Sequence, residues 1–277
     1  SRRDVISRAL GLACGGALLP GCAGPFSGAE TKQPWLLGCY TRPWEKYDYQ
    51  VALDQIALAG FKYAALMTCK APRRLVISPS TSIAEAQRVG EEARQRDLKI
   101  LSAYGGGISV AKSLADGIDD IKRLIDNCAA CGSESLLMGG TADQKTFAAY
   151  YQAIAQCCDY AADQGVGITI KPHGGLNATG PQCREIVQRV NHKNFRIWYE
   201  AGNILYYSNG ELDPVKDAPS VDGLVVGMCI KDYRHPKNVA VTPGSGQVDF
   251  PAVMARLPEG GIPGGPRGVG GLQGVNV

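Results

Sequence analysis

The sequence lacks a concentrated positive charge and a long uninterrupted run of apolar residues. Its 277 residues have a formal net charge of only +3, and Arg2, Arg3, Arg8 and Asp4 together account for +2 of it. A nucleic-acid-binding protein needs a clustered basic patch, so we expect no nucleic-acid partner. The apolar stretch at residues 9–19 is too short and too rich in glycine to predict a transmembrane span.

Recognisable metal-binding motifs are also scarce. The chain has ten cysteines, but Cys128 and Cys131 form a CxxC motif without a second pair at zinc-ribbon spacing. Both lie in a segment that we expect to be helical, where a free cysteine packs like a small apolar residue. We therefore interpret them as core residues. Only three histidines occur, His173, His192 and His235.

Residues 1–24 have the layout of a bacterial export signal. The pair Arg2-Arg3 is followed by an apolar stretch and then by small residues, as in such signals, and it resembles a twin-arginine signal. Residues 19–22, Leu-Pro-Gly-Cys, resemble a lipoprotein cleavage site, which makes Cys22 a candidate lipid anchor. We therefore expect an exported protein, either periplasmic or anchored to the membrane as a lipoprotein. The alternative is an N-terminal helix of the domain itself.

Strand-like and helix-like segments alternate over residues 34–257. The expected strands are short and apolar, at Trp35–Tyr40, Phe61–Met67, Leu98–Tyr104, Ser135–Met138, Val166–Ile170, Phe195–Tyr199 and Leu224–Ile230. The expected helices lie at Val51–Ala59, Ser82–Arg96, Val110–Cys131, Ala142–Gln164, Pro181–Val190 and Phe250–Leu257. This alternation predicts parallel strands covered by helices. We therefore expect an α/β fold, a (β/α)8 TIM barrel, with a doubly wound open sheet as the alternative.

The eighth strand of this barrel has little support in the sequence. Residues 258–277 are rich in glycine, which supplies eight of the last eighteen residues, and no acidic residue follows Glu259. Glycine has no side chain to pack a central strand. We therefore expect the eighth strand to be poorly formed or missing, and residues 258–277 to be an atypical tail. A shifted reading frame or a truncated gene would produce such a sequence.

Polar residues follow three consecutive expected strands. In both candidate folds the ligand site lies at the C-terminal ends of the strands. The residues at these three ends are Lys171, His173, Glu200, Asn203, Cys229, Lys231 and Asp232, and Tyr104 ends the third strand. Because parallel strands end on the same side of the sheet, we expect these side chains to converge on one site.

Some of these side chains have a simple structural explanation, and others have a functional one. A carboxylate at Glu200 is costly to bury unless it is paired or bound to a cation, and Lys171 on the neighbouring strand can pair with it. Lys171 can instead extend to the barrel rim. His173 is followed by two glycines, which would leave the backbone open to a ligand. Lys231 shares a strand face with Cys229 and could hold a sugar hydroxyl, carbonyl or phosphate.

The last third of the chain resembles a known family. The segments Tyr-Glu-Ala-Gly-Asn at 199–203, Cys-Ile-Lys-Asp at 229–232 and Gly-Ser-Gly-Gln-Val-Asp-Phe at 244–250 are similar to strand ends of the xylose isomerase-like barrel family. The resemblance spans residues 35–257 and implies a (β/α)8 barrel. Enzymes of this family bind a divalent metal through a Glu, an Asp, a His and a second Glu, and move a proton beside a sugar carbonyl.

This sequence departs from the family pattern at the metal ligands. Lys171 stands where the first Glu is expected, Glu200 replaces the Asp, and Cys229 replaces the His. The glycine-rich tail offers no second Glu. His173 matches a histidine found two residues beyond the family's first Glu. A tentative metal site for Mn, Mg, Co or Zn would therefore consist of Glu200, His173 and Cys229.

A reaction without a metal is the alternative that the charges suggest. The ammonium group of Lys171 would stabilise a developing oxyanion, with His173 or Glu200 as the base. A Schiff base at Lys171 is a further option. Lys231 completes the candidate catalytic set. The candidate substrate-binding residues are Asn203, Asp232 and Tyr104.

The resemblance implies an enzyme that acts on a small-molecule carbohydrate. We expect an isomerase or epimerase that transfers a proton beside a sugar carbonyl. Three alternatives stay open on the sequence alone. The first is a keto-sugar lyase of the same fold, and the second is a sugar-binding barrel that has lost its metal site and its chemistry. The third is a defective fragment of an active relative.

Overall fold

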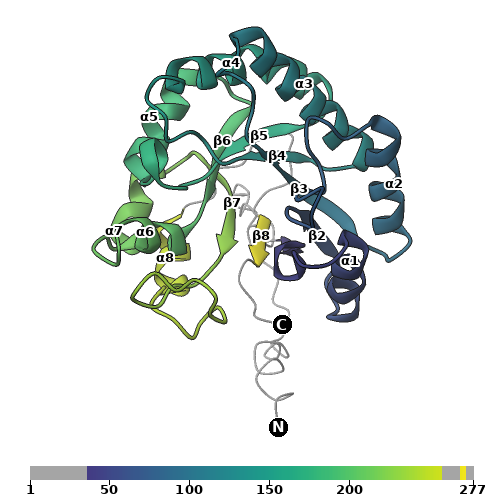
Figure 1. Cartoon of the computed structure of the whole chain (residues 1–277). Helices are drawn as coiled ribbons and strands as arrows, with labels where there is room; N and C mark the ends of the chain where they lie inside the picture. The colour runs from purple at the N-terminus through teal and green to yellow at the C-terminus, as the bar shows by residue number, and fades with distance from the viewer. Residues whose placement is uncertain (1–35, 258–268, 273–277) are drawn as a thin grey trace, which may run out of the picture. The chain divides into compact units, whose positions relative to one another are not determined.

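Eight parallel strands close into a barrel in sequence order, with helices around the outside (Figure 1). The computed structural model describes residues 36–257 and 269–272. The strands are β1 (Leu36–Tyr40), β2 (Tyr63–Leu66), β3 (Lys99–Gly106), β4 (Ser135–Met138), β5 (Gly167–Ile170), β6 (Phe195–Tyr199), β7 (Val225–Ile230) and β8 (Val269–Leu272). The predicted TIM barrel is therefore confirmed, and the open sheet is excluded by the pairing of β8 with β1.

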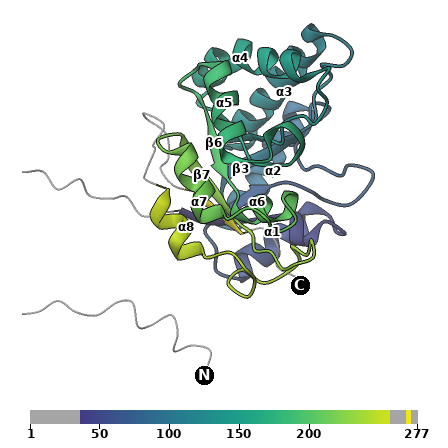
Figure 2. The same cartoon turned by 90° about the vertical axis from the view of Figure 1, so that its left-hand side faces the viewer.

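The helices follow the strands along the chain. They are α1 (Tyr49–Leu58), α2 (Ile83–Arg94), α3 (Leu114–Cys131), α4 (Phe147–Asp163), α5 (Gly180–Val190), α6 (Ala201–Tyr207), α7 (Pro214–Asp217) and α8 (Phe250–Arg256), with short 3-10 turns at Arg42–Trp44, Gly175–Asn177 and Ala218–Val221. Figure 2 shows α3, α4 and α5 grouped together, and both α3 and α5 contact α4. None of the helices in the described ranges is long and apolar enough to cross a membrane.

Local capping sets where several helices begin. Ser82 and Glu85 form the capping box that the sequence predicts at the start of α2. Helix α3 begins at Leu114, later than the expected Val110, because the Ser113 side chain accepts a hydrogen bond from the Asp116 amide. The sequence analysis did not predict α6, which begins directly after Glu200.

The eighth strand exists but is short and half glycine. Val269–Leu272 pairs in parallel with both β7 and β1, and residues 270 and 271 are glycines. The expectation of a poor eighth strand is therefore confirmed, whereas the expectation of a missing one is wrong. Strand pairing uses backbone groups, so glycine can close the barrel without contributing a side chain. Part of the segment expected to be a tail thus belongs to the barrel.

Strand alternation divides the core into an outer layer and an inner layer. The outer layer lies between strands and helices and includes Ile170, Tyr199 and Met228. A second buried cluster fills the barrel interior and consists of Tyr40, Ala65, Met67, Leu101, Leu137, Trp198 and Cys229. Because side chains alternate along a strand, the residue after Ile170 and the residue after Tyr199 both face inward. These residues are Lys171 and Glu200.

Cysteines of the described ranges pack as apolar residues. All eight are buried and free of disulfide bonds, including Cys128 and Cys131 on α3. This agrees with their interpretation as core residues. Residues 1–24, with the expected export signal and the candidate anchor Cys22, lie outside the described residues.

Candidate functional site

The ends of β5, β6 and β7 bring two lysines and one glutamate together inside the barrel mouth. Lys171 Nζ lies 2.9 Å from Glu200 Oε2, and Lys231 Nζ contacts Glu200 Oε1. The side chains of Lys171 and Glu200 are 1% and 0% exposed, whereas that of Lys231 is 13% exposed. The structure therefore confirms the predicted Lys171–Glu200 pair and adds Lys231 as the more accessible cation.

The two lysines share one carboxylate, and this sharing sets the charges of the cluster. Burial acts to raise the pKa of Glu200, but Lys171 and Lys231 together lower it to about 2. Burial acts to lower the pKa of Lys171, yet Glu200 outweighs it and the pKa is raised. The pKa of Lys231 is lowered by burial. Glu200 raises this pKa but does not fully offset burial, because the positive charge of Lys171 lowers it further.

His173 lies beside the cluster with its ring between two tyrosines. Its ring centroid is 6.5 Å from that of Tyr104 and 5.8 Å from that of Tyr207. Burial and the nearby Lys171 lower the pKa of His173 to about 4. The imidazole is therefore neutral at pH 7, and its free nitrogen can accept a proton.

Glycines beside His173 have a different role from the one expected. Gly174 has φ +85°, and a Cβ there would overlap the ring of Tyr207. A Cβ on Gly175 would overlap Ala142. These glycines thus make room for neighbouring side chains and do not open the backbone to a ligand. Tyr207, which sequence reasoning missed, fills the space over Gly174.

Asn203 holds the ends of two strands together. Its Nδ2 donates a hydrogen bond to the Pro172 carbonyl oxygen at 2.6 Å, and its Oδ1 accepts one from Lys231 Nζ. The side chain is buried. Asn203, predicted to bind substrate, therefore positions Lys231.

Asp232 anchors the loop after β7. Its carboxylate is fully buried and accepts hydrogen bonds from the backbone amides of Tyr233, Gly244, Gly246 and Val248 at 2.7–3.0 Å. With both oxygens occupied in this way, Asp232 has a structural role where the sequence predicted substrate binding. Three of the four amides lie twelve to sixteen residues along the chain, so the sequence alone could not show that these oxygens are already used.

Tyr104, predicted to bind substrate, lies beside Lys171 and His173. Lys171 Nζ lies 5.6 Å above the ring centroid of Tyr104, an arrangement that stabilises the ammonium through the ring's negative face.

Arg42, on the turn after β1, also contributes to the low pKa of His173 through its positive charge. Arg42 is exposed. The sequence analysis missed it because it lies on the loop after the first strand, far from the other candidates in sequence.

The tentative metal site is not assembled. The described part of the chain contains no group of three or more His, Cys, Asp or Glu side chains that could hold a metal ion. Both oxygens of Glu200 contact ammonium groups, which compete directly with a cation. Burial, with Glu200 next in effect, raises the pKa of the Cys229 thiol to about 12, so it is not a thiolate ligand. Glu200, His173 and Cys229 therefore do not fit a divalent cation.

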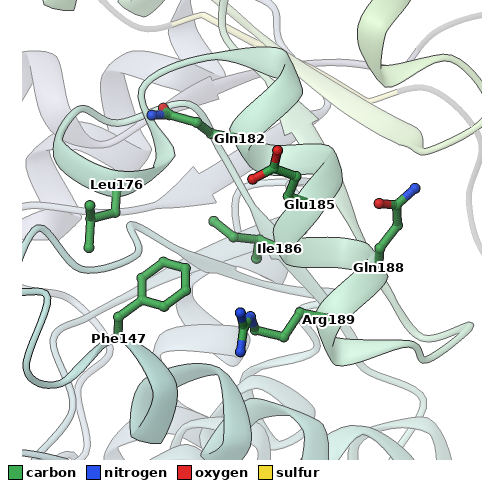
Figure 3. Close-up of a pocket in the computed structure, with 7 residues that line it drawn as sticks. All are labelled: Phe147, Leu176, Gln182, Glu185, Ile186, Gln188 and Arg189. Carbon is green, nitrogen blue, oxygen red and sulfur yellow. The ribbon is translucent and has the colours of Figure 1, made fainter.

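Two surface pockets lie apart from this cluster. One, of about 510 Å³, is lined by Phe147, Leu176, Gln182, Glu185, Ile186, Gln188 and Arg189 (Figure 3). The Arg189 guanidinium lies 5.6 Å from the centroid of the Phe147 ring. The other, of about 650 Å³, lies beside α1 and the loop after β2. Neither pocket contains a predicted site residue.

Several solved structures share this fold. D-allulose 3-epimerase from Methylomonas sp., in complex with D-allulose, is 18% identical with a TM-score of 0.64, covering 87% of this chain and 84% of that one. The 3-keto-D-glucoside 4-epimerase of E. coli is 14% identical with a TM-score of 0.64, covering 88% and 94%. A probable 3-DHS dehydratase of Bacillus anthracis is 13% identical with a TM-score of 0.62, covering 86% and 92%. At these identities the similarity establishes the fold alone.

The family assignment rests on the sequence match. No curated protein matches the chain. The model of one family, described as xylose isomerase-like TIM barrel, matches residues 53–265, which is more than half of the chain. That span includes the strand ends that carry Lys171, Glu200 and Lys231. The chain therefore belongs to the xylose isomerase-like TIM barrel family.

Proposed function

We propose that this protein is a carbohydrate isomerase or epimerase that transfers a proton on the carbon beside a sugar carbonyl. The observation that carries the proposal is the buried Lys171–Glu200–Lys231 cluster at the strand ends, with a neutral His173 beside it. Sugar epimerases that share the fold support a carbohydrate as the small-molecule partner. The cluster supplies positive charge at the position where an enediolate would form.

His173 is the proposed base. Glu200 is a weak candidate because both its oxygens contact ammonium groups and its pKa is about 2. The imidazole of His173 is neutral at pH 7, and part of its low pKa comes from Lys171 and Lys231. Negative charge that develops on a substrate beside these lysines would offset their effect and raise the pKa of His173 as it takes the proton.

Lys231 is the proposed oxyanion partner. An ammonium group has three N–H donors, and Glu200 and Asn203 account for two of those of Lys231, which leaves one for a substrate oxygen. The substrate C–H bond would break, the proton would move to His173, and the electron pair would form an enediolate whose oxygen faces Lys231. Return of the proton to the neighbouring carbon, with the hydroxyl proton passing to the original carbonyl oxygen, gives the isomer. Return of a proton to the same carbon from the opposite face gives the epimer.

Lys171 contributes positive charge to the cluster and does not act as a nucleophile. A Schiff base needs a neutral amine, and Glu200 raises the pKa of Lys171 and keeps it as an ammonium. Its side chain is also 1% exposed. We therefore assign it to the positive charge of the cluster and to the shape of the site.

A keto-sugar lyase is the second candidate. It shares the first proton transfer, after which the enediolate expels a leaving group from the next carbon. The lowered pKa of Lys231 favours this reading, because it makes the ammonium a better proton donor to the departing oxygen. A dehydratase shares the fold.

Solvent proton exchange tests the proposal. The protein is incubated in heavy water with a panel of ketoses and aldoses, and deuterium at the carbon beside the carbonyl is measured by mass spectrometry and NMR. We expect exchange with at least one sugar. An altered stereocentre indicates an epimerase, a moved carbonyl an isomerase, and an unsaturated product the lyase. Binding of sugars without any exchange contradicts catalysis and supports a binding barrel.

Matched variants separate the roles of the two site residues. His173→Gln should lower the exchange rate by roughly 10²–10⁴, the usual contribution of a general base. Lys231→Met should lower it by roughly 10²–10³, as for loss of an oxyanion donor. The controls are His192→Gln, at a surface pair with Asp159, and Lys216→Met, whose side chain is 86% exposed. If the controls reduce exchange as much as the site variants, the assignment is wrong.

We also propose that residues 1–24 direct export, with lipid attachment at Cys22 as one form of it. The support is the order of arginine pair, apolar stretch and small residues. The test is intact-mass measurement after expression of the full chain in a bacterial host. A mass without residues 1–21 supports cleavage, and an added lipid mass supports the anchor. A mass that retains those residues contradicts both.

A further inference from the structure

The buried cluster at the barrel mouth carries an unmatched positive charge. Two ammonium groups, Lys171 and Lys231, contact one carboxylate, Glu200, and within residues 36–257 neither lysine forms another ion pair. Within the described ranges the neighbouring Asp232 forms no ion pair with either lysine, and its oxygens instead accept hydrogen bonds from four backbone amides. A buried charge without a partner is costly, so a bound anion would stabilise this arrangement.

The neighbouring groups also point to a site that is positive overall. His173 stays neutral beside the lysines, and the exposed Arg42 acts on it in the same direction. Lys237 lies 5.7 Å over the ring centroid of Tyr206, next to Tyr207. Tyr207 is 38% exposed and offers an apolar face to a sugar ring. The mouth therefore combines aromatic side chains with excess positive charge.

Of the two lysines, Lys231 is the more accessible to a ligand. Lys171 is 1% exposed and faces Glu200 and the Tyr104 ring, whereas Lys231 is 13% exposed and keeps one N–H donor beyond Glu200 and Asn203. A single donor can serve two acceptor oxygens only if they lie close together. A carbonyl oxygen and a carboxylate oxygen on adjacent carbons meet that condition.

We propose that the substrate is a sugar acid whose carboxylate stands next to its keto group, a 2-keto aldonic acid, and that Lys231 binds both groups. This inference rests on the proposed proton transfer and names its substrate class. One unmatched buried charge corresponds to one carboxylate, whereas a phosphate monoester carries about −1.5 to −2 at pH 7. The same ammonium that holds the carboxylate then faces the enediolate oxygen.

Three ligands with the same carbon skeleton test the inference. 2-Keto-D-gluconate and D-fructose differ only in a carboxylate or a hydroxymethyl group at C1, and D-fructose 1-phosphate places a phosphate there. Binding to the full chain is measured by calorimetry at low salt. We expect 2-keto-D-gluconate to bind at least about tenfold more tightly than D-fructose, as for one charge-assisted hydrogen bond. Equal affinities overturn the inference, and tightest binding of the phosphate overturns the carboxylate assignment.

Variants show where the anion binds. Lys231→Met should reduce the affinity for 2-keto-D-gluconate to that for D-fructose, while Lys216→Met should leave both unchanged. If Lys231→Met does not fold, a measurement on the wild type replaces this variant. The affinity for 2-keto-D-gluconate is divided by that for D-fructose, and the ratio is compared at low and high salt. That ratio should fall as salt screens the charge, and a constant ratio contradicts the inference.

The outcomes for substrate class and for reaction type are independent. Preference for the acid without deuterium exchange would support the anion site and contradict the proton transfer. Exchange on D-fructose without preference for the acid would support the reaction and contradict the anion site.

Discussion

Glu200 is the residue on which the charge balance of the site depends. Its carboxylate lies between two buried ammonium groups and is itself 0% exposed. Glu200→Gln would leave both lysines buried without a counter-charge. We expect the free energy of unfolding to fall by about 3–5 kcal/mol, the usual effect of breaking a buried ion pair. Urea unfolding at pH 7 measures it.

A surface variant is the control for this prediction. Glu211 is exposed, so Glu211→Gln should change the free energy of unfolding by no more than about 0.5 kcal/mol. If Glu200→Gln is equally mild, the cluster does not hold charged lysines in the folded protein.

Acid should weaken the fold through the same residue. The pKa of Glu200 is about 2 in the folded protein against an ordinary 4.5, so the folded state favours the ionised form. The resulting stability is present above pH 4.5 and is lost as the pH falls toward 2. The shift corresponds to about 3 kcal/mol at neutral pH. Urea unfolding between pH 7 and pH 2 should show this loss, and Glu200→Gln should lose less stability over the same interval.

Residue by residue, the sequence predicted positions better than roles. Strand alternation and the barrel rule place Lys171, Glu200 and Lys231 at one mouth, and the structure agrees. The roles of Asn203 and Asp232 were not predictable. Most of their partners lie on other segments of the chain, and only the folded chain shows that their polar atoms are already used.

At the level of elements, the loop after β5 shows how a glycine sets the site. Gly174 has φ +85° and supports the ring of Tyr207 next to His173, while Gly60 has φ +87° with open space around it. Gly174 also has ψ −177°, a backbone region almost confined to glycine, so its replacement adds backbone strain to the overlap with Tyr207. Gly60 shares the positive φ but has no neighbouring side chain to displace.

Gly174→Ala should be more damaging than Gly60→Ala. At Gly60 we expect a loss of about 1 kcal/mol from the positive φ alone. At Gly174 the overlap with Tyr207 should add about 1–3 kcal/mol and lower sugar affinity. Thermal unfolding and calorimetric titration with D-fructose measure the two effects. Equal losses at both sites would show that Tyr207 does not pack over Gly174.

For the whole molecule, the sequence predicted the barrel but not its closure. Seven strands carry apolar side chains that pattern reasoning detects, and β8 carries glycine at half its positions. What closes the barrel is backbone pairing of β8 with both β7 and β1. Pairing of this kind depends on two open strand edges in the folded chain, and no local pattern in residues 258–277 encodes it.

Substitutions in β8 test whether this closure supports the site. Gly270→Pro together with Gly271→Pro removes two backbone donors from a strand that pairs on both sides, at a cost of about 1–3 kcal/mol per lost buried hydrogen bond. Gly270→Ala with Gly271→Ala keeps the donors and is the matched control. We expect the proline pair to lower the melting temperature far more than the alanine pair. Because β7 leads into Lys231, it should also weaken sugar binding, and equal effects of the two pairs would show that β8 does not close the barrel.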